Sequence, residues 1–301
     1  MSSTTRTSIF RWTRRILGGL VTLVVAALAV VYALSEQRLR RTYDVASHPL
    51  TVPADSASIA RGAHLAQIRG CVGCHGMGFE GKVEMDNLML GRLAGPNLTR
   101  GRTGAPLTDA DWERAVRHGV RANGKGLFIM PAFEHNGMSD EDLGAIAAYA
   151  RSLDPSPNVP PPSRAGPVIR AMFLAGVVPV LSAAEIDHAK PHPASVVAEA
   201  TPAYGGYLAS MCMGCHGPGM SGGKIPGGPP DWKPASNLTP SGLAHYTEES
   251  FMVAMRTGVR PDGSKIDPQM PYELFGKMND TELRAILSYL RTLAPRAYGS
   301  R

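Results

Sequence analysis

The pattern Cys-x-x-Cys-His occurs twice, at residues 71–75 and 212–216, and constrains the fold more than any other feature of the sequence. The two copies contain all four cysteines of the chain. A redox dithiol, a structural disulfide or half of a zinc site also uses paired cysteines. The histidine that follows each pair favours covalent attachment of a c-type haem, in which the thiols bond to the porphyrin and the imidazole binds iron. We predict two haem c groups, held by Cys71, Cys74, His75, Cys212, Cys215 and His216.

Length and charge limit the class of protein. At 301 residues, with the motifs 141 residues apart, the chain has room for one domain around each motif. The formal charge is +6, but residues 1–41 alone contain seven Arg and one Glu, so residues 42–301 sum to zero. The net positive charge therefore comes entirely from the N-terminal residues, and no nucleic-acid partner is expected.

An uncharged run of nineteen residues, Ile16 to Leu34, follows a polar, Arg-containing start. At about 1.5 Å per residue a helix of this length spans roughly 28 Å, close to a bilayer core. The apolar region of a signal peptide is shorter, although Ala33-Leu34-Ser35 would permit cleavage. We predict a cytoplasmic N-terminus at 1–15 and an uncleaved transmembrane anchor at 16–35.

The remaining chain contains an internal repeat. Asn97-Leu98-Thr99 corresponds to Asn237-Leu238-Thr239, and residues 138–155 align with 278–295 at an offset of 140. The repeated Asn-Leu-Thr is better explained by the fold than by glycosylation. Apolar residues at helical spacing predict a closing amphipathic helix in each repeat, with Ser139 and Asn279 as N-caps. The expected organisation is a tether at 36–54, domain 1 at 55–155, a Pro-rich connector at 156–201, domain 2 at 202–296 and a tail at 297–301.

The connector contains the apolar run Val168 to Leu181. Its fourteen residues include Arg170 and Pro179, so it is too short and too interrupted for a second membrane span. We expect it to pack against one or both domains, or against a partner subunit.

These features resemble the c-type cytochromes, specifically membrane-anchored dihaem proteins with two class I haem domains. The resemblance implies an all-α fold, with tandem class I cytochrome c domains after an N-terminal transmembrane helix. In that family the last helix of each domain crosses the first, and Gly62 or Gly205 would permit the close approach. Haem c is attached outside the bacterial inner membrane in such proteins, which places everything after residue 35 in the periplasm.

The resemblance also suggests the sixth iron ligands. Met130 and Met270 lie 55 and 54 residues after the motif histidines, and each precedes proline, as in the family's Met-Pro pattern. The predicted iron ligands are therefore His75, Met130, His216 and Met270. Met138 and Met278 are also paired between repeats, but their place before a helix cap predicts a packing role. Bis-His ligation is less favoured because no further histidine is shared by the repeats: His135 aligns with Phe275, His118 with Thr257, and His64 with Gly205.

Family features around the haem suggest further roles. Pro96 occupies the position whose carbonyl accepts a hydrogen bond from the proximal imidazole, whereas the second repeat has Ser236 there, with Pro234 nearby. Arginines at matched positions would contact haem propionates or form an exposed helix face: Arg117, Arg121, Arg256 and Arg260.

Two haems with both axial positions filled indicate one-electron transfer, so we expect an electron carrier that is not itself an enzyme. The domains resemble cytochrome subunits of membrane-bound alcohol and gluconate dehydrogenases, although those usually carry three motifs and this chain has two. The expected partners are the inner membrane and redox proteins of a periplasmic respiratory chain, namely a dehydrogenase or a quinol-oxidising complex. The alternatives are a cytochrome subunit or donor of a terminal oxidase, similar to that of cbb3 oxidases, and a dihaem peroxidase.

Overall fold

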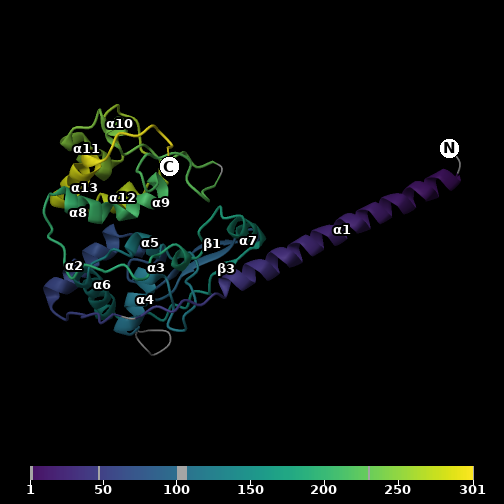
Figure 1. The fold of residues 1–301 in the computed structure, drawn as a ribbon, viewed down its shortest axis with the longest axis horizontal. Helices are drawn as coiled ribbons and strands as arrows, with labels where there is room; N and C mark the ends of the chain where they lie inside the picture. The colour runs from purple at the N-terminus through teal and green to yellow at the C-terminus, as the bar shows by residue number, and fades with distance from the viewer. Residues whose placement is uncertain (1–2, 47, 100–106, 230, 301) are drawn as a thin grey trace.

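The computed structural model describes residues 3–46, 48–99, 107–229 and 231–300. Figure 1 shows two helical lobes at one end of a long N-terminal helix, with domain 2 beside domain 1. The elements in chain order are α1 (Ser3–Leu39), α2 (Ser56–Ile68), α3 (Cys71–His75), β1 (Lys82–Asn87), β2 (Gly91–Gly95), α4 (Asp109–His118), α5 (Ala132–His135), α6 (Asp140–Ser152), β3 (Arg164–Ala165), α7 (Pro167–Leu174), η1 (Ser182–Ala184), α8 (Pro202–Leu208), η2 (Ala209–Cys212), α9 (Met213–His216), α10 (Pro240–Leu243), α11 (Glu248–Thr257), α12 (Tyr272–Phe275) and α13 (Asp280–Thr292).

Helix α1 projects away from both lobes (Figure 1). Among the described residues it is the one helix that is long and apolar enough to cross a membrane, over Phe10–Leu39. The helix extends beyond the predicted 16–35 segment at both ends, since the polar residues that flank the apolar run also adopt helical conformation.

Each domain is built on a crossing of its first and last helices, as predicted. Helix α2 crosses α6, and α8 crosses α13, with a glycine at each crossing point. A Cβ atom added to Gly62 would lie 1.9 Å from the Ala145 carbonyl oxygen, and one added to Gly205 would lie 1.9 Å from that of Ala285. The equivalence of these glycines places His64 opposite Tyr207, which corrects the alignment of His64 with Gly205.

The closing helices begin at the predicted caps. The Ser139 hydroxyl accepts the Asp142 N–H at 3.2 Å, and Asn279 forms a reciprocal capping box with Glu282. Met138 and Met278, just before these caps, are only 2% and 3% exposed, which fits the predicted packing role. Buried apolar side chains from both domains form one continuous cluster.

A small antiparallel sheet was not anticipated. β1 and β2 form a hairpin between the first Cys-x-x-Cys-His motif and Pro96, and β3 of the connector pairs with β2 through Arg92 and Arg164. β1 (KVEMDN) alternates polar and apolar residues over only five positions and is mostly exposed, and β2 (GRLAG) does not alternate. The sheet therefore depends on the pairing of β2 with the distant strand β3, which the local sequence does not indicate.

The apolar connector run packs against both α1 and domain 1. Helix α7 lies along the end of α1, where Arg170 donates to the Ser35 hydroxyl and the Glu36 carboxylate, each at 2.8 Å. Farther on, Val180 and Leu181 are buried, and the Ile129 N–H donates to the Val180 carbonyl at 2.8 Å.

The connector is also fastened at a buried histidine. His118 lies between Glu113 and connector residue His188, with each nitrogen–partner distance 3.0 Å. The His188 Nε2 atom lies 3.0 Å from the Ala183 carbonyl oxygen, so this ring is held on both sides. These contacts fix the course of the connector around domain 1.

Candidate haem sites

The first Cys-x-x-Cys-His motif forms the single helical turn α3. Left-handed Gly70 (φ 74°) precedes the turn and Gly76 (φ 83°) follows it, a backbone that favours glycine. His75 is 8% exposed, and its Nδ1 atom lies 2.9 Å from the Pro96 carbonyl oxygen. Because a carbonyl only accepts, Nδ1 carries the proton and Nε2 keeps its lone pair. Burial also lowers the pKa of His75, so the ring is a neutral imidazole suited to binding a metal.

The second motif repeats this arrangement across η2 and α9. The His216 Nδ1 atom lies 2.7 Å from the Ser236 carbonyl oxygen, and Gly217 again has a positive φ of 78°. The acceptor is a main-chain carbonyl, so serine performs the role that proline has in domain 1, and Pro234 is not needed.

The repeated Asn-Leu-Thr segments hold these carbonyls in place. The Thr99 N–H donates to the Asn97 side chain at 2.8 Å, and the Thr239 N–H to that of Asn237 at 2.9 Å. The Leu98 and Leu238 N–H groups each donate to the main chain shortly after the motif histidine. This geometry supports a structural explanation for the repeated sequence.

The four cysteines are half-buried, and none forms a disulfide. Burial raises the pKa of Cys71 to about 11 and that of Cys212 to about 12. Such thiols stay protonated near neutral pH and lack the low pKa of a reactive redox dithiol. Within the described ranges, no group of three or more His, Cys, Asp or Glu side chains is placed to bind a metal ion by itself.

The two predicted methionine ligands lie in differently supported segments. Both are half-buried and stand before the short helices α5 and α12. The Met130 carbonyl accepts a hydrogen bond of 2.5 Å from the buried connector residue Ser182, and Ile129 before it has a positive φ of 51°. The main-chain hydrogen bonds of Met270 are local: its N–H donates to the Asp267 carbonyl and its carbonyl accepts the Tyr272 N–H; the residue also borders a cavity.

The spare histidines and the arginines serve other contacts. His118 is engaged by Glu113 and His188, which leaves little support for bis-His ligation through it. Buried Arg117 donates to the Met138 carbonyl and to the Asp140 carboxylate, and thereby joins α4 to the start of α6. Arg256 pairs with Asp280 at the matched place in domain 2, and Arg260 donates to the Lys265 carbonyl, while Arg121 is exposed. These contacts differ from the predicted propionate role.

Both motifs lie at the interface between the domains. Helix α5, which follows Met130, packs against η2, and the Ser210 hydroxyl donates to the Glu134 carbonyl at 2.9 Å. The Glu134 carboxylate accepts the Gly214 N–H, and burial nevertheless raises its pKa to about 7. Reciprocally, α12, which follows Met270, packs against α2.

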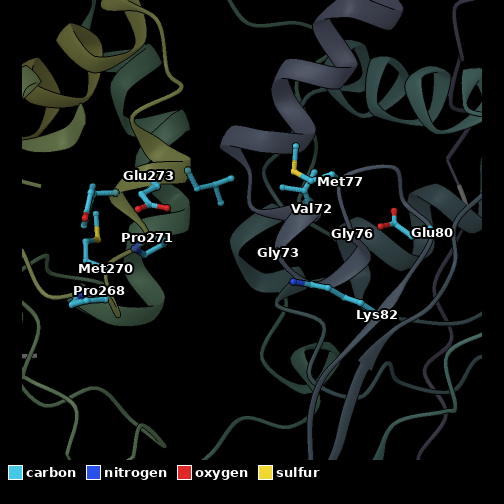
Figure 2. A pocket seen from close by; sticks show the side chains of 12 residues that line it. Val72, Gly73, Gly76, Met77, Glu80, Lys82, Pro268, Met270, Pro271 and Glu273 are labelled. Carbon is cyan, nitrogen blue, oxygen red and sulfur yellow. The ribbon is translucent and has the colours of Figure 1, made fainter. Parts of the chain in front are cut away.

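A cavity of about 600 Å³ opens at the same interface (Figure 2). Val72 and Gly73 of the first motif border it from domain 1, and the segment from Met270 to Leu274 borders it from domain 2. The first attachment turn and the predicted distal ligand of the second site therefore share one space.

Two polar pairs at matched positions hold the domains together. The His64 Nε2 atom lies 2.8 Å from a Glu282 carboxylate oxygen, and the Tyr207 hydroxyl donates to Asp142 at 2.6 Å. His64 corresponds to Tyr207 and Glu282 to Asp142, so the pairs are related as by a pseudo-two-fold axis. Arg69 adds a cation–π contact, with its guanidinium carbon 4.4 Å from the centre of the Tyr207 ring.

Comparisons with known proteins agree with this duplicated geometry. Residues 57–149 match the family described as cytochrome c oxidase, cbb3-type, subunit III, and residues 203–294 match the cytochrome c family. The chain carries two cytochrome c domains. Each match contains one Cys-x-x-Cys-His motif, one predicted methionine ligand and the crossing pair of helices that encloses them.

The cytochrome c domains have relatives among dehydrogenase subunits. The cytochrome c subunit of alcohol dehydrogenase (quinone) from Gluconacetobacter polyoxogenes is 27% identical over 310 residues, covering 86% of this chain and 62% of that protein. The gluconate 2-dehydrogenase cytochrome c subunit of Pantoea cypripedii is 36% identical over 103 residues, covering 32% and 23%. The fructose dehydrogenase cytochrome subunit of Gluconobacter japonicus is 33% identical over 93 residues, covering 28% and 19%. The chain is homologous to these cytochrome c subunits but spans less than two thirds of their length.

The donor set in each cytochrome c domain fits a haem c. One short turn presents two thiols for thioether formation and an imidazole whose Nδ1 is already hydrogen-bonded to a main-chain carbonyl. The paired cysteines 71/74 and 212/215 thus imply two haem c groups.

Proposed function

We propose that this protein is a membrane-anchored dihaem cytochrome c that carries single electrons in a periplasmic respiratory chain. It would accept them from a membrane-associated dehydrogenase or quinol-oxidising complex and deliver them to a downstream acceptor. The observation that carries this proposal is the reciprocal interface, at which each domain packs its Met-Pro segment toward the attachment turn of the other. A haem c bound at each site supplies reversible one-electron chemistry at its iron.

The chain's own residues set the conditions for that chemistry. Cys71, Cys74, Cys212 and Cys215 would hold the two groups, with His75 and His216 as proximal ligands. The carbonyls of Pro96 and Ser236 fix the orientation of each imidazole through Nδ1. Met130 and Met270 would each supply a further iron ligand, and a fully ligated iron would favour a carrier over a peroxidase.

Contacts at the end of α1 support an uncleaved anchor. Arg170 of α7 donates to Ser35 and Glu36 and also lies over the Tyr32 ring, 4.6 Å from its centre. Cleavage near Ala33-Leu34-Ser35 would separate Tyr32 from the rest of this contact. The proposed topology places residues 1–15 in the cytoplasm and both cytochrome domains in the periplasm, after a single span in the bacterial inner membrane.

The axial ligands are tested by Met130→Ala and Met270→Ala, with exposed Met89→Ala as the matched control. Each ligand variant should open one of the two reduced haems to carbon monoxide, whereas Met89→Ala should bind no more than wild type. An unchanged low-spin spectrum without carbon monoxide binding in either variant would refute the assignment.

The partner is tested by gentle solubilisation of native membranes and capture of the full chain through a C-terminal tag. Capture of a flavin- or quinone-dependent dehydrogenase would support the proposed electron outlet. Capture of oxidase subunits would support the second candidate, a subunit or donor of a terminal oxidase, which the match of residues 57–149 favours. Rapid peroxide turnover by the purified protein would instead favour an enzyme.

A further inference from the structure

The turn of the β1–β2 hairpin exposes apolar side chains near the base of α1. Leu88 and Met89 in this turn are 80% and 54% exposed. The turn is joined to α7, because the Val168 N–H donates to the Met89 carbonyl at 3.0 Å and the Gly166 N–H to the Leu90 carbonyl at 2.9 Å. Figure 1 shows β1, β3 and α7 grouped where α1 meets the body of the protein.

Helix α7 extends this apolar surface. Its sequence is PVIRAMFL, its large apolar side chains are partly exposed, and Val177 just beyond it is 47% exposed. Its one charged residue, Arg170, is turned toward α1, where it pairs with Glu36 at 2.8 Å. The rest of α7 therefore offers apolar surface with no charge of its own facing outward. We call α7 and residues 88–90 the apolar platform.

Contacts with α1 fix the level of the platform relative to a bilayer. Arg170 touches Tyr32, Ser35 and Glu36, and the Arg38 side chain donates to the Leu174 carbonyl at 3.3 Å. The uncharged run of α1 ends at Leu34, so the edge of the hydrocarbon core falls within this same stretch. Tyrosine and arginine are characteristic of that boundary. The platform thus lies at the level of the lipid head groups.

We propose that the apolar platform is a second membrane contact, lying in the outer interfacial layer of the lipid bilayer beside the anchor. Amphipathic elements of this kind bury their apolar face about 5–10 Å into the head-group boundary. Lipid is the favoured occupant because the anchor itself brings the bilayer to this level, whatever else is bound. The inference rests on the proposed anchoring by α1, and it implies that the cytochrome domains are held in one orientation above the membrane.

The test uses the full-length holoprotein in phosphatidylethanolamine–phosphatidylglycerol vesicles. Leu88→Cys is compared with Val253→Cys, which is 44% exposed on α11 of domain 2, in a part of Figure 1 remote from α1. Both are reacted with a membrane-impermeant maleimide, and an unchanged haem spectrum confirms that each variant is folded. Leu88→Cys should react about tenfold more slowly than Val253→Cys, since thiol modification requires access from water.

Each outcome is decisive. Equal labelling rates in vesicles would overturn the proposal. Rapid labelling in pure lipid with protection only in native membranes would also overturn it, by assigning the platform to a protein partner. Extraction of the protein from vesicles by alkaline carbonate would refute the anchor itself, which separates failure of that premise from failure of the platform. Slow labelling at Leu88→Cys in pure lipid, with the protein retained by the membrane, would support the proposal.

Discussion

One added methyl group should force apart the two helices that cross in domain 2. In Gly205→Ala the new Cβ would lie 1.9 Å from the Ala285 carbonyl oxygen and 2.8 Å from the Tyr289 Cβ atom. Real Cβ contacts almost never fall below 3.0 Å, so the shortfall to the carbonyl is 3.0 − 1.9 = 1.1 Å. The obstructing atom belongs to the main chain of α13 and cannot rotate away. Helices α8 and α13 must therefore separate by about this distance.

The cost follows from the contacts that the separation weakens. Buried apolar side chains fill the space beside the crossing: Leu208, Leu283, Ile286 and Leu287. A gap of this size forfeits at least a quarter of each contact, or about 2 kcal/mol in all. Overpacking strain adds about 1–3 kcal/mol, while the lower entropy of the unfolded Ala chain offsets about 0.4–1 kcal/mol. We expect a net loss of about 3 kcal/mol and a fall in Tm of about 15 °C.

Thermal unfolding followed by circular dichroism and haem absorbance measures this loss. Gly62→Ala makes the same contact with Ala145 in domain 1 and should have a similar effect there. Gly137→Ala is the matched control, because its Cβ would meet nothing within 4 Å. A Tm for Gly205→Ala equal to that of the control would show that the crossing is not as close as described.

Three further predictions concern groups around the interface and the first site. The pKa of Glu134 is raised to about 7, so the wild type loses stability as pH rises from about 4.5 to 7. Over that range the free energy of unfolding of Glu134→Gln, measured with denaturant, should fall by about 2 kcal/mol less than that of the wild type. The hydrogen bond to Glu282 raises the pKa of His64, so the pair stabilises the protein below about pH 6.5 and weakens as pH rises through the folded pKa. His64→Gln should therefore be more destabilising at about pH 5.5 than at about pH 8.5 in the same assay. Ser182→Ala removes one of the two donors to the Met130 carbonyl and leaves the Ala132 N–H, at a cost of about 1 kcal/mol, and should speed carbon monoxide binding at the first haem only.

Specific results would contradict these predictions. Parallel stability profiles of Glu134→Gln and wild type across the pH range would show that this carboxyl does not titrate between its unfolded and folded pKa. If His64→Gln lowered stability equally at both pH values, the charge of His64 would make no contribution to its interaction with Glu282. Faster carbon monoxide binding at both haems of Ser182→Ala would indicate a general loosening of the fold.

The duplicated helical frame was predictable because the same motifs occur at nearly the same spacing in both halves of the sequence. The similar spacing of the haem motif, Asn-Leu-Thr and the closing helix predicts two domains of similar fold. Gly62 and Gly205 indicated where the first and last helices of each domain cross. The assignment of His75 and His216 as proximal ligands comes from the motif chemistry and stays a prediction, and the structure adds the carbonyl that each Nδ1 faces. Ser236 shows the limit of that approach, since the carbonyl that orients His216 is main chain and leaves no mark on residue type.

The sheet and the interface could not be predicted from local pattern. β2 pairs with β3 some seventy residues later, at Arg92 and Arg164, and neither segment has a strong strand signal alone. The pairing of His64 with Glu282 depends on how two complete domains dock. The available sequence signal for the interface was a pair of matched positions with different residue types, such as His64 and Tyr207. Matching these two positions requires allowing for the shorter first helix of domain 2.

The reciprocal packing at the interface limits how this protein can be dissected. An isolated domain 1 would leave its α3 turn without the α12 segment that borders the same cavity, and an isolated domain 2 would lose Glu134 from beside Gly214. Each half would then lose part of the protein surface that borders its attachment turn in the whole protein. Reduction potentials titrated on separately expressed halves would consequently describe two different electrochemical environments, and their sum would not reproduce the intact redox curve.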